Sequence, residues 1–288
     1  MRHLLSINDL TDQELDELTA PGAPAPSAAF PGQTMGMLFE QPSLRTMASF
    51  VSASAAMGLT PCAVTTTGDT LRDQCDLVDE LVQLSMVTRC VVSRTRAELP
   101  ASIRTQLQAP LVNAGDGSNE HPTQCLVDVM AMRADGLDGH KVVLMGNLRD
   151  HRVHHSLFQA LTRLGASVTC VSPPELRLPA RYSFGREEHV LTTCSSEVNE
   201  AMSAADFVYL TPVKYWNTPE LGFNGAFDLN LARASHALKR TARILHPFPR
   251  LGELHTDLDG SQFDAYSGQV RLGPTVRRRV LQLLLTSG

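Results

Sequence analysis

Phe39-Glu-Gln-Pro-Ser-Leu-Arg-Thr46 decides the fold of the first half of this chain, because an apolar strand predicted over Thr34 to Phe39 leads directly into a helix that opens with Ser-x-Arg-Thr. Such a helix start can bind an anion through the serine N-cap, the backbone N–H groups of the first turn and the positive end of the helix dipole. The guanidinium of Arg45 can donate two further hydrogen bonds to the same anion. Apolar residues at three- and four-residue spacing predict a buried face for this helix. The residues of that face are Met47, Phe50, Val51 and Ala55. An ordinary capped helix explains the octapeptide equally well, so the rest of the chain has to decide.

The composition of the 288 residues is that of a globular protein long enough for two domains, with 43% apolar and 19% charged residues. A net charge of −5 offers no broad positive field to nucleic acid or to an anionic membrane, so an anion has to be captured locally. The six cysteines show no C-x-x-C pairing and most lie in apolar runs, which favours buried, reduced thiols over disulfides or a zinc site. Because there is neither a signal-peptide core nor an apolar span of about 18 residues, the sequence predicts a soluble, cytoplasmic protein.

Strand and helix signals alternate along the chain, which predicts mainly parallel sheets. In the first part, the expected elements are a helix from Ser6 to Leu18, a Pro-rich connector from Ala20 to Gly32, strands over 60–65, 88–93 and 111–113, a helix carrying Leu71, Cys75, Val78 and Val82, and a long helix over 122–133. Ligands of such sheets sit beyond the carboxyl ends of the strands, and Ser43, Arg94 and His121 all fall at that edge.

A second set of the same signals follows Ala134-Asp-Gly-Leu-Asp-Gly139, where we expect a domain boundary. The expected elements are strands over 141–145, 167–171, 206–210 and 242–245, a helix over 153–164 and a final helix from Pro274 to Leu285. The run Arg277-Arg-Arg279 in the final helix is expected to form a solvated or subunit-facing surface rather than an anion site.

Two further motifs accompany Ser-x-Arg-Thr: Asn113-Ala-Gly-Asp-Gly-Ser-Asn-Glu-His-Pro-Thr-Gln124 and His246-Pro-Phe-Pro-Arg250. In this order and spacing they resemble the aspartate/ornithine carbamoyltransferase family, nearest to its aspartate branch, over almost the whole chain. The resemblance implies an α/β fold of two doubly wound parallel-sheet domains that face each other across a cleft. It assigns residues 1–134 to a carbamoyl phosphate-binding domain, on which the C-terminal helix 273–286 packs back, and residues 135–272 to an amino-acceptor-binding domain. It also implies a homotrimer with active sites between subunits, and neither a metal nor a cofactor.

The resemblance further implies how carbamoyl phosphate is held. The start of the helix binds the phosphate, Arg94 bridges phosphate and carbonyl oxygen, and His121 helps to polarise that carbonyl. The expected catalytic residues are Arg45, Thr46, Arg94 and His121. The expected binding residues also include Ser43, Leu44 through its backbone, Gln124, and the backbone carbonyls of Phe248 and Pro249, which accept the carbamoyl N–H groups. The departing phosphate takes the proton of the attacking amine, so no dedicated protein base is expected, and His246 is expected to order a loop.

The donor side departs from the family pattern at Gln41, where an acidic or basic residue is usual, and at three further positions. Leu44 lacks a hydroxyl that could meet the phosphate. Ala63 and Thr67 stand where the aspartate branch has a Ser and a Lys that reach into a neighbouring subunit's site. Loss of an ammonium beside a phosphate dianion is expected to weaken binding or to slow transfer.

The acceptor side departs more strongly. Arg152 and His155 match residues of the aspartate branch, but Pro212 replaces a carboxylate-binding Arg and Lys214 replaces a Gln. A point charge does not reproduce the two-pronged recognition of a carboxylate by Arg. The sequence therefore predicts an acceptor other than aspartate or ornithine, a carboxylate-bearing amine bound by Arg152, Lys214 and His155.

Two alternatives stay open at this point. The chain is an aspartate carbamoyltransferase that tolerates Pro212 and Thr67, or it is a paralogue that binds an anion or a partner subunit without turnover. A dehydrogenase is excluded, because Gly146-Asn-Leu-Arg-Asp-His-Arg152 lacks the G-x-G-x-x-G turn that a pyrophosphate requires.

Overall fold

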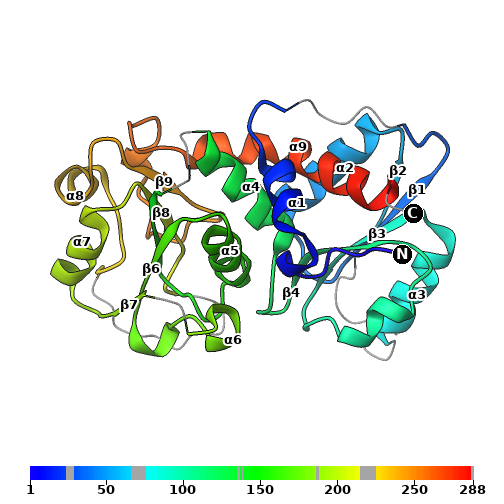
Figure 1. The fold of residues 1–288 in the computed structure, drawn as a ribbon, viewed down its shortest axis with the longest axis horizontal. Helices are drawn as coiled ribbons and strands as arrows, with labels where there is room; N and C mark the ends of the chain where they lie inside the picture. The colour runs from blue at the N-terminus through cyan, green and yellow to red at the C-terminus, as the bar shows by residue number, and fades with distance from the viewer. Residues whose placement is uncertain are drawn as a thin grey trace. The chain divides into compact units, whose positions relative to one another are not determined.

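The computed structural model describes residues 1–23, 29–65, 76–134, 137, 139–185, 188–214 and 225–286. The chain divides into two compact units, one of Met1–Val127 with Leu272–Gly288 and one of Asp128–Arg271. The division falls inside two helices, α4 (Pro122–Arg133) and α9 (Tyr266–Thr286), which are green and orange-red in Figure 1. Each unit is an α/β layer structure built on its own parallel sheet, as the sequence predicts.

The sheet of the first unit has four parallel strands in the order β2-β1-β3-β4 (Figure 1). The strands are β1 (Thr34–Phe39), β2 (Thr60–Thr65), β3 (Cys90–Thr95) and β4 (Leu111–Asp116). The helices are α1 (Asp12–Thr19), α2 (Leu44–Ala56) and α3 (Leu77–Val87), with a 3-10 helix at Ala101–Thr105. Strands β1, β3 and β4 are buried along nearly their whole length, because a parallel sheet is covered on both faces and therefore needs near-continuous apolar runs.

The N-terminal segment differs from the single helix expected over residues 6–18. Ser6 caps a 3-10 helix at Ile7–Asp9, and Thr11 starts α1 with a capping box in which its Oγ1 accepts the N–H of Glu14 at 3.2 Å. Each of these hydroxyl side chains satisfies a helix N-terminus, so the segment starts two helices instead of one.

Helix α2 also buries a different face from the one expected. Phe50 is buried, but Val51 and Ala55 are exposed, and the buried side includes Ser49 and Ala53 instead. Ser49 can be buried because its Oγ donates to the carbonyl oxygen of Thr46 at 3.0 Å, which satisfies the hydroxyl within the helix.

The sheet of the second unit has five parallel strands in the order β7-β6-β5-β8-β9. The strands are β5 (Lys141–Met145), β6 (Ser167–Ser172), β7 (Glu188–Leu191), β8 (Phe207–Leu210) and β9 (Arg243–Leu245). The helices are α5 (Arg152–Arg163), α6 (Ala180–Ser183), α7 (Ser195–Ser203) and α8 (Leu231–Ala237), with 3-10 helices at Pro174–Leu176 and Thr256–Leu258. Sequence periodicity did not predict β7, α7 or α8, because β7 is a short, largely polar edge strand and α7 buries only Val198 and Met202.

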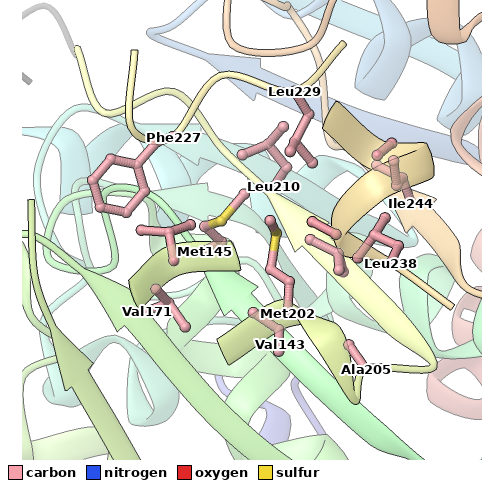
Figure 2. Packing of buried hydrophobic residues seen from close by; sticks show 14 of the residues in the cluster. Val143, Met145, Val171, Met202, Ala205, Leu210, Phe227, Leu229, Leu238 and Ile244 are labelled. Atoms are coloured by element: carbon pink, nitrogen blue, oxygen red, sulfur yellow. The ribbon is translucent and has the colours of Figure 1, made fainter. Parts of the chain in front are cut away.

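One core of buried apolar side chains supports this second sheet (Figure 2). It joins the strands to α7 and α8, with Val143, Met145 and Leu210 from the sheet meeting Met202 of α7 and Leu238, which follows α8. Each such side chain, when fully buried, contributes about 1.5–3 kcal/mol to the stability of the fold, so this core holds the carboxyl ends of the strands in place.

The arginines of α9 are not the surface that the sequence predicts. Helix α9 starts at Tyr266 and contains Pro274 in its interior, and Arg277 and Arg279 are only 3% and 7% exposed. The guanidinium of Arg277 lies over the ring of Phe50 at 5.0 Å, which pairs a desolvated cation with an aromatic face.

Arg279 closes the C-terminal end of α1. Its guanidinium donates to the carbonyl oxygens of Leu18 at 3.0 Å, Ala20 at 2.8 Å and Ala23 at 2.6 Å. The last carbonyls of a helix lack partners within the helix, so a five-donor guanidinium can be buried there without losing its hydrogen bonds.

Three of the described cysteines, Cys90, Cys125 and Cys170, are buried, whereas Cys62 and Cys194 are exposed. None of the helices in the described part of the chain has the length and apolar character that a bilayer crossing requires. No group of three potential ligands that could hold a metal ion is found among the same residues.

Candidate functional site

The strand order of the first unit reverses between β1 and β3, and the predicted phosphate-binding residues lie at the carboxyl end of this pair. Phe39, the last residue of β1, is in register with Arg94, and the N–H of Glu40 donates to the carbonyl oxygen of Arg94 at 2.9 Å. Four residues later Leu44 starts α2. The sheet therefore brings the start of α2 and Arg94 to one edge of this unit.

The N-terminus of α2 has an unusual cap. Ser43 occupies the N-cap position with an extended backbone, but its side chain caps no backbone N–H. Its Oγ donates to Oγ1 of Thr46 at 2.9 Å instead. A helix of thirteen residues thus presents its positive end without the acceptor that an N-cap serine usually supplies, which is the arrangement that binds phosphate.

Arg94 and His121 are in contact within this unit. Nη1 of Arg94 donates to the carbonyl oxygen of Ala114 at 3.0 Å and lies 3.4 Å from Nε2 of His121. The guanidinium of Arg94 and the imidazole of His121 therefore lie next to each other at one edge of the first sheet. His121 immediately precedes α4, and Gln124 lies in its first turn and is partly exposed.

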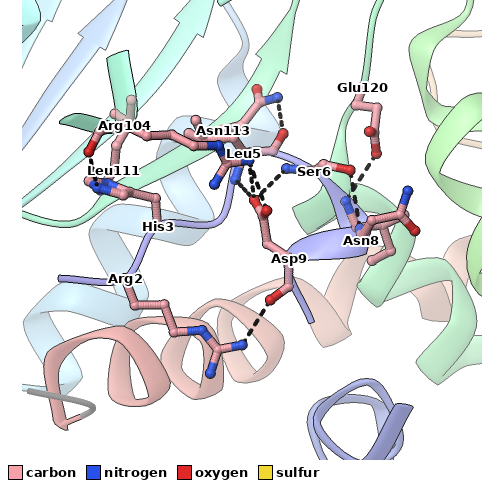
Figure 3. A network of polar contacts seen from close by, with 11 residues as sticks. Arg2, His3, Leu5, Ser6, Asn8, Asp9, Arg104, Leu111, Asn113 and Glu120 are labelled. Atoms are coloured by element: carbon pink, nitrogen blue, oxygen red, sulfur yellow. Dashed lines mark hydrogen bonds and ion pairs between the residues drawn. The ribbon is translucent and has the colours of Figure 1, made fainter. Parts of the chain in front are cut away.

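The loop between β4 and His121 is held by a buried polar network (Figure 3). Nδ2 of Asn113 donates to the carbonyl oxygen of Leu5 and to Oδ1 of Asp116, both at 2.8 Å. Oε2 of Glu120 accepts the N–H of Ile7 at 3.0 Å. These motif residues position His121 from the N-terminal segment, a role for which the sequence pattern gave no signal.

The second sheet reverses its order between β5 and β8, and the predicted acceptor residues follow these two strands. Gly146 follows β5 with a φ of +117°, and a Cβ there would collide with the carbonyl oxygen of Thr211, so only glycine fits this close approach. Arg152 is the first residue of α5 and is buried. Lys214 follows β8 and is exposed.

The turn that joins β5 to α5 carries an ionised carboxylate. Burial alone would raise the pKa of Asp150, but hydrogen bonds from Arg149 and Asn147 hold it below its usual range. Oδ1 of Asn147 also accepts the N–H of Asp150 at 2.9 Å, so two hydrogen bonds between these residues fix the turn.

His155 lies inside the second unit rather than on its surface. It is fully buried, its Nε2 donates to the carbonyl oxygen of Leu148 at 2.9 Å, and its ring stacks on Tyr182 with 4.0 Å between the ring centroids. The neighbouring His154 is also fully buried, with Nε2 at 2.9 Å from Oγ1 of Thr211. Burial holds the pKa of His154 well below its usual value, so this imidazole is neutral.

The loop after β9 presents the two backbone carbonyls predicted to bind the carbamoyl amide. Phe248 has a φ of +55° and is partly exposed, and Pro249 is exposed. His246 is fully buried below them, hydrogen-bonded to Glu253 and to the N–H of Phe248. Of the divergent positions, Ala63 is an exposed residue of β2, whereas Thr67 lies outside the described residues.

Comparison with known proteins matches both halves of the chain. Residues 2–134 match the family model for the aspartate/ornithine carbamoyltransferase carbamoyl-P binding domain, and residues 138–284 match the model for the Asp/Orn binding domain. The aspartate carbamoyltransferase catalytic subunit of Thermococcus gammatolerans is 32% identical over 88% of this chain and 85% of its own length. That of Chromobacterium violaceum is 30% identical over 99% of this chain and 98% of its own length.

Solved structures share the fold. Aspartate transcarbamoylase from Trypanosoma cruzi in complex with carbamoyl phosphate superposes with a TM-score of 0.84 over 97% of this chain and 94% of that chain, at 23% sequence identity. The complex of the same enzyme with N-(phosphonacetyl)-L-aspartic acid gives a TM-score of 0.83 at 24% identity with the same coverage.

Proposed function

This chain belongs to the aspartate/ornithine carbamoyltransferase family and is a carbamoyltransferase, and we propose that it transfers the carbamoyl group of carbamoyl phosphate to the amino group of aspartate. The observation that carries the donor half is the uncapped start of α2 beside the Arg94–His121 contact. The relatives named aspartate carbamoyltransferase support the acceptor half.

The start of α2 binds the phosphate group. Ser43, Arg45 and Thr46 supply side-chain donors, and Leu44 supplies a backbone N–H, so its exposed side chain needs no polar group. The phosphate is a dianion, so the positive end of the α2 dipole and the guanidinium of Arg45 both attract it.

Arg94, His121 and Thr46 act on the carbonyl oxygen. This oxygen becomes an oxyanion in the tetrahedral intermediate, and donors already in place stabilise it without reorganisation. The carbonyl oxygens of Phe248 and Pro249 and the side chain of Gln124 accept the carbamoyl N–H groups and fix the plane of the carbamoyl group.

The amine nitrogen then forms a bond to the carbamoyl carbon, and the carbon–oxygen bond to phosphate breaks. The phosphate leaves with the electron pair of that bond and takes the proton released by the amine. Proximity and electrostatics therefore supply the catalysis without a protein base.

Arg152 and Lys214 bind the carboxylates of the acceptor, from the carboxyl ends of β5 and β8. A second candidate function is transfer to a different carboxylate-bearing amine, which Pro212 and Lys214 favour because an ammonium does not reproduce a guanidinium fork. We also propose that the chain forms a homotrimer with active sites between subunits, and the mass in solution, measured by light scattering, tests this.

Calorimetric titration with carbamoyl phosphate, followed by an assay for carbamoyl-aspartate, tests the proposal. We expect carbamoyl phosphate to bind, and aspartate to be carbamoylated faster than other amino acids. Binding of carbamoyl phosphate with carbamoylation of a different amine would select the second candidate. Absence of carbamoyl phosphate binding would reject both.

A further inference from the structure

His246 is completely enclosed, and both of its ring nitrogens have partners. Nε2 lies 2.7 Å from Oε1 of Glu253, and Nδ1 lies 2.9 Å from the backbone nitrogen of Phe248. The side chains of His246 and Glu253 are 0% and 4% exposed. Oε2 of Glu253 accepts the N–H of Leu251 at 2.8 Å, so both carboxylate oxygens are used inside the same loop.

These partners define one tautomer of His246. The N–H of Phe248 can only donate, so Nδ1 is an acceptor and carries no proton. Nε2 then carries the proton and donates to Glu253. Burial alone would raise the pKa of Glu253, but the hydrogen bond from His246 holds it below its usual range, so the carboxylate is available as the acceptor.

Phe248 needs this support because its backbone is in a left-handed conformation, with a φ of +55°. A bulky residue rarely adopts such a conformation and keeps it only where its surroundings impose it. The ring of Phe248 packs edge-on against His246 at 5.3 Å and Tyr266 at 5.9 Å, and Arg250 lies over it at 5.3 Å. The imidazole of His246 thus holds both the N–H and the ring of Phe248.

The backbone of His246 is anchored in turn. Its N–H donates to Oε1 of Gln269 at 3.2 Å, and Nε2 of Gln269 donates to Oδ1 of Asp128. The other oxygen of Asp128 accepts the hydroxyl of Tyr209 at 2.7 Å. Since a carboxylate can only accept, Asp128 orients the amide of Gln269 so that its oxygen faces His246. The backbone of the histidine is therefore held by groups outside the loop, whereas its ring is held by Phe248 and Glu253 within the loop.

We propose that His246 is a positioning residue whose neutral Nε2–H tautomer, set by Glu253, holds the Phe248–Pro249 backbone in the conformation that presents its carbonyl oxygens to the carbamoyl amide. This inference rests on the proposed function of those two carbonyls. His246 does not contact carbamoyl phosphate itself. It acts through the peptide of Phe248, and Glu253 acts one step further away by choosing which nitrogen accepts.

Three variants separate this role from simple packing. In E253Q, the amide oxygen still accepts the N–H of Leu251, so the amide nitrogen faces Nε2 of His246 and donates to it. The imidazole proton then moves to Nδ1, where it points at the N–H of Phe248 and replaces a hydrogen bond by a repulsive contact. H246Q keeps a donor for Glu253 but has no acceptor for Phe248. The double variant H246N/E253Q restores an acceptor near the position of Nδ1 and leaves no buried charge unpaired.

Calorimetry with carbamoyl phosphate and, separately, with inorganic phosphate reads out the result. We expect E253Q and H246Q to lose about 10-fold in affinity for carbamoyl phosphate, the cost of misplacing a hydrogen-bonding group, while the affinity for inorganic phosphate stays within about 2-fold. H246N/E253Q should recover to within about 3-fold of the unmodified protein, although it leaves a larger void than E253Q alone. A merely structural role predicts the opposite order, with the double variant worst and both ligands affected equally, and that result overturns the proposal.

Imidazole 15N chemical shifts keep the inference separate from the proposed function. The unmodified protein should show His246 protonated at Nε2 and E253Q should show it protonated at Nδ1. If these shifts are found but carbamoyl phosphate binds no more tightly than inorganic phosphate, the proposed function fails and the tautomer assignment stands. If the shifts are the same in both proteins, the positioning role is wrong whatever the enzyme binds.

Discussion

Nη1 of Arg94 lies 3.4 Å from Nε2 of His121, and the same nitrogen donates to the carbonyl oxygen of Ala114 at 3.0 Å. The main chain of β4 thus aims the guanidinium at the imidazole. Arg94 lies near the end of β3, and His121 immediately precedes α4, which follows β4, so their contact depends on the parallel pairing of β3 with β4.

Replacement of His121 by alanine should lower kcat by about 10²- to 10³-fold, because one donor to the developing oxyanion is lost. The affinity for inorganic phosphate should stay unchanged, since the phosphate is held by α2. Steady-state kinetics and calorimetry measure the two quantities. The exposed His255 gives a matched control, and H255A should behave like the unmodified protein. A kcat for H121A within a few-fold of the control would remove His121 from the site.

Ser43 and Thr11 occupy equivalent N-cap positions but should respond differently to alanine. S43A should change the free energy of unfolding by less than about 0.5 kcal/mol, because its hydroxyl caps no backbone N–H, while T11A should cost about 1 kcal/mol. S43A should instead lower phosphate affinity about 5- to 10-fold. Urea denaturation and calorimetry test the pair, and equal losses of stability would show that Ser43 is an ordinary cap.

Arg279 should be a large stabilising residue. R279A should lower the free energy of unfolding by about 2–4 kcal/mol, since it removes a buried guanidinium and leaves carbonyl oxygens at the end of α1 without a partner. R279K should give an intermediate loss of stability, because one ammonium cannot reach all the carbonyl oxygens to which the planar guanidinium donates. Arg271, an exposed residue of the same helix, is the control. If R271A and R279A lose the same stability, the capping role is wrong.

His154 should make the protein less stable in acid. Its pKa is held well below 6.5 by burial, with further lowering by the nearby His151, His155 and His246. The unfolded chain therefore takes up a proton that the folded chain refuses. The contribution of neutral His154 to the free energy of unfolding is fully present above about pH 6.5. Below that pH the free energy of unfolding falls by up to about 1.4 kcal/mol per pH unit for this one group.

The variant H154N tests this slope. An asparagine amide can still meet Thr211 but does not titrate, so the free energy of unfolding should fall less steeply between about pH 6.5 and pH 5. The slope is the readout, because the variant also lowers stability at every pH. An unchanged slope would show that other groups control acid unfolding.

Lys214 should govern the acceptor and not the donor. K214Q should raise the KM for aspartate about 10-fold with little change in the affinity for carbamoyl phosphate, because one charge facing a carboxylate is removed. Lys141 is exposed at the N-terminal end of β5, whereas Lys214 follows the C-terminal end of the neighbouring strand β8, so K141Q is the control. If neither variant changes the KM for aspartate, Lys214 does not bind the acceptor.

The elements of the fold were largely readable from local pattern. The predicted bounds of β1, β2, β5 and α4 coincide with those observed, because buried parallel strands are continuous apolar runs and α4 follows a Pro after a polar loop. The strand-end positions of Ser43, Arg94 and His121 followed from the same reasoning. Short polar elements such as β7 carried no such pattern and were missed.

The sequence by itself determined the alternation of strands and helices, the family motifs and the residue types available for anion binding. Only the tertiary structure decided which face of α2 is buried, that Arg277 and Arg279 lie inside, and that His155 packs against Tyr182. The physical reason is that burial of a polar group depends on the partners that satisfy it. The carbonyls that receive Arg279 lie at the other end of the chain, and no local periodicity encodes a partner that distant.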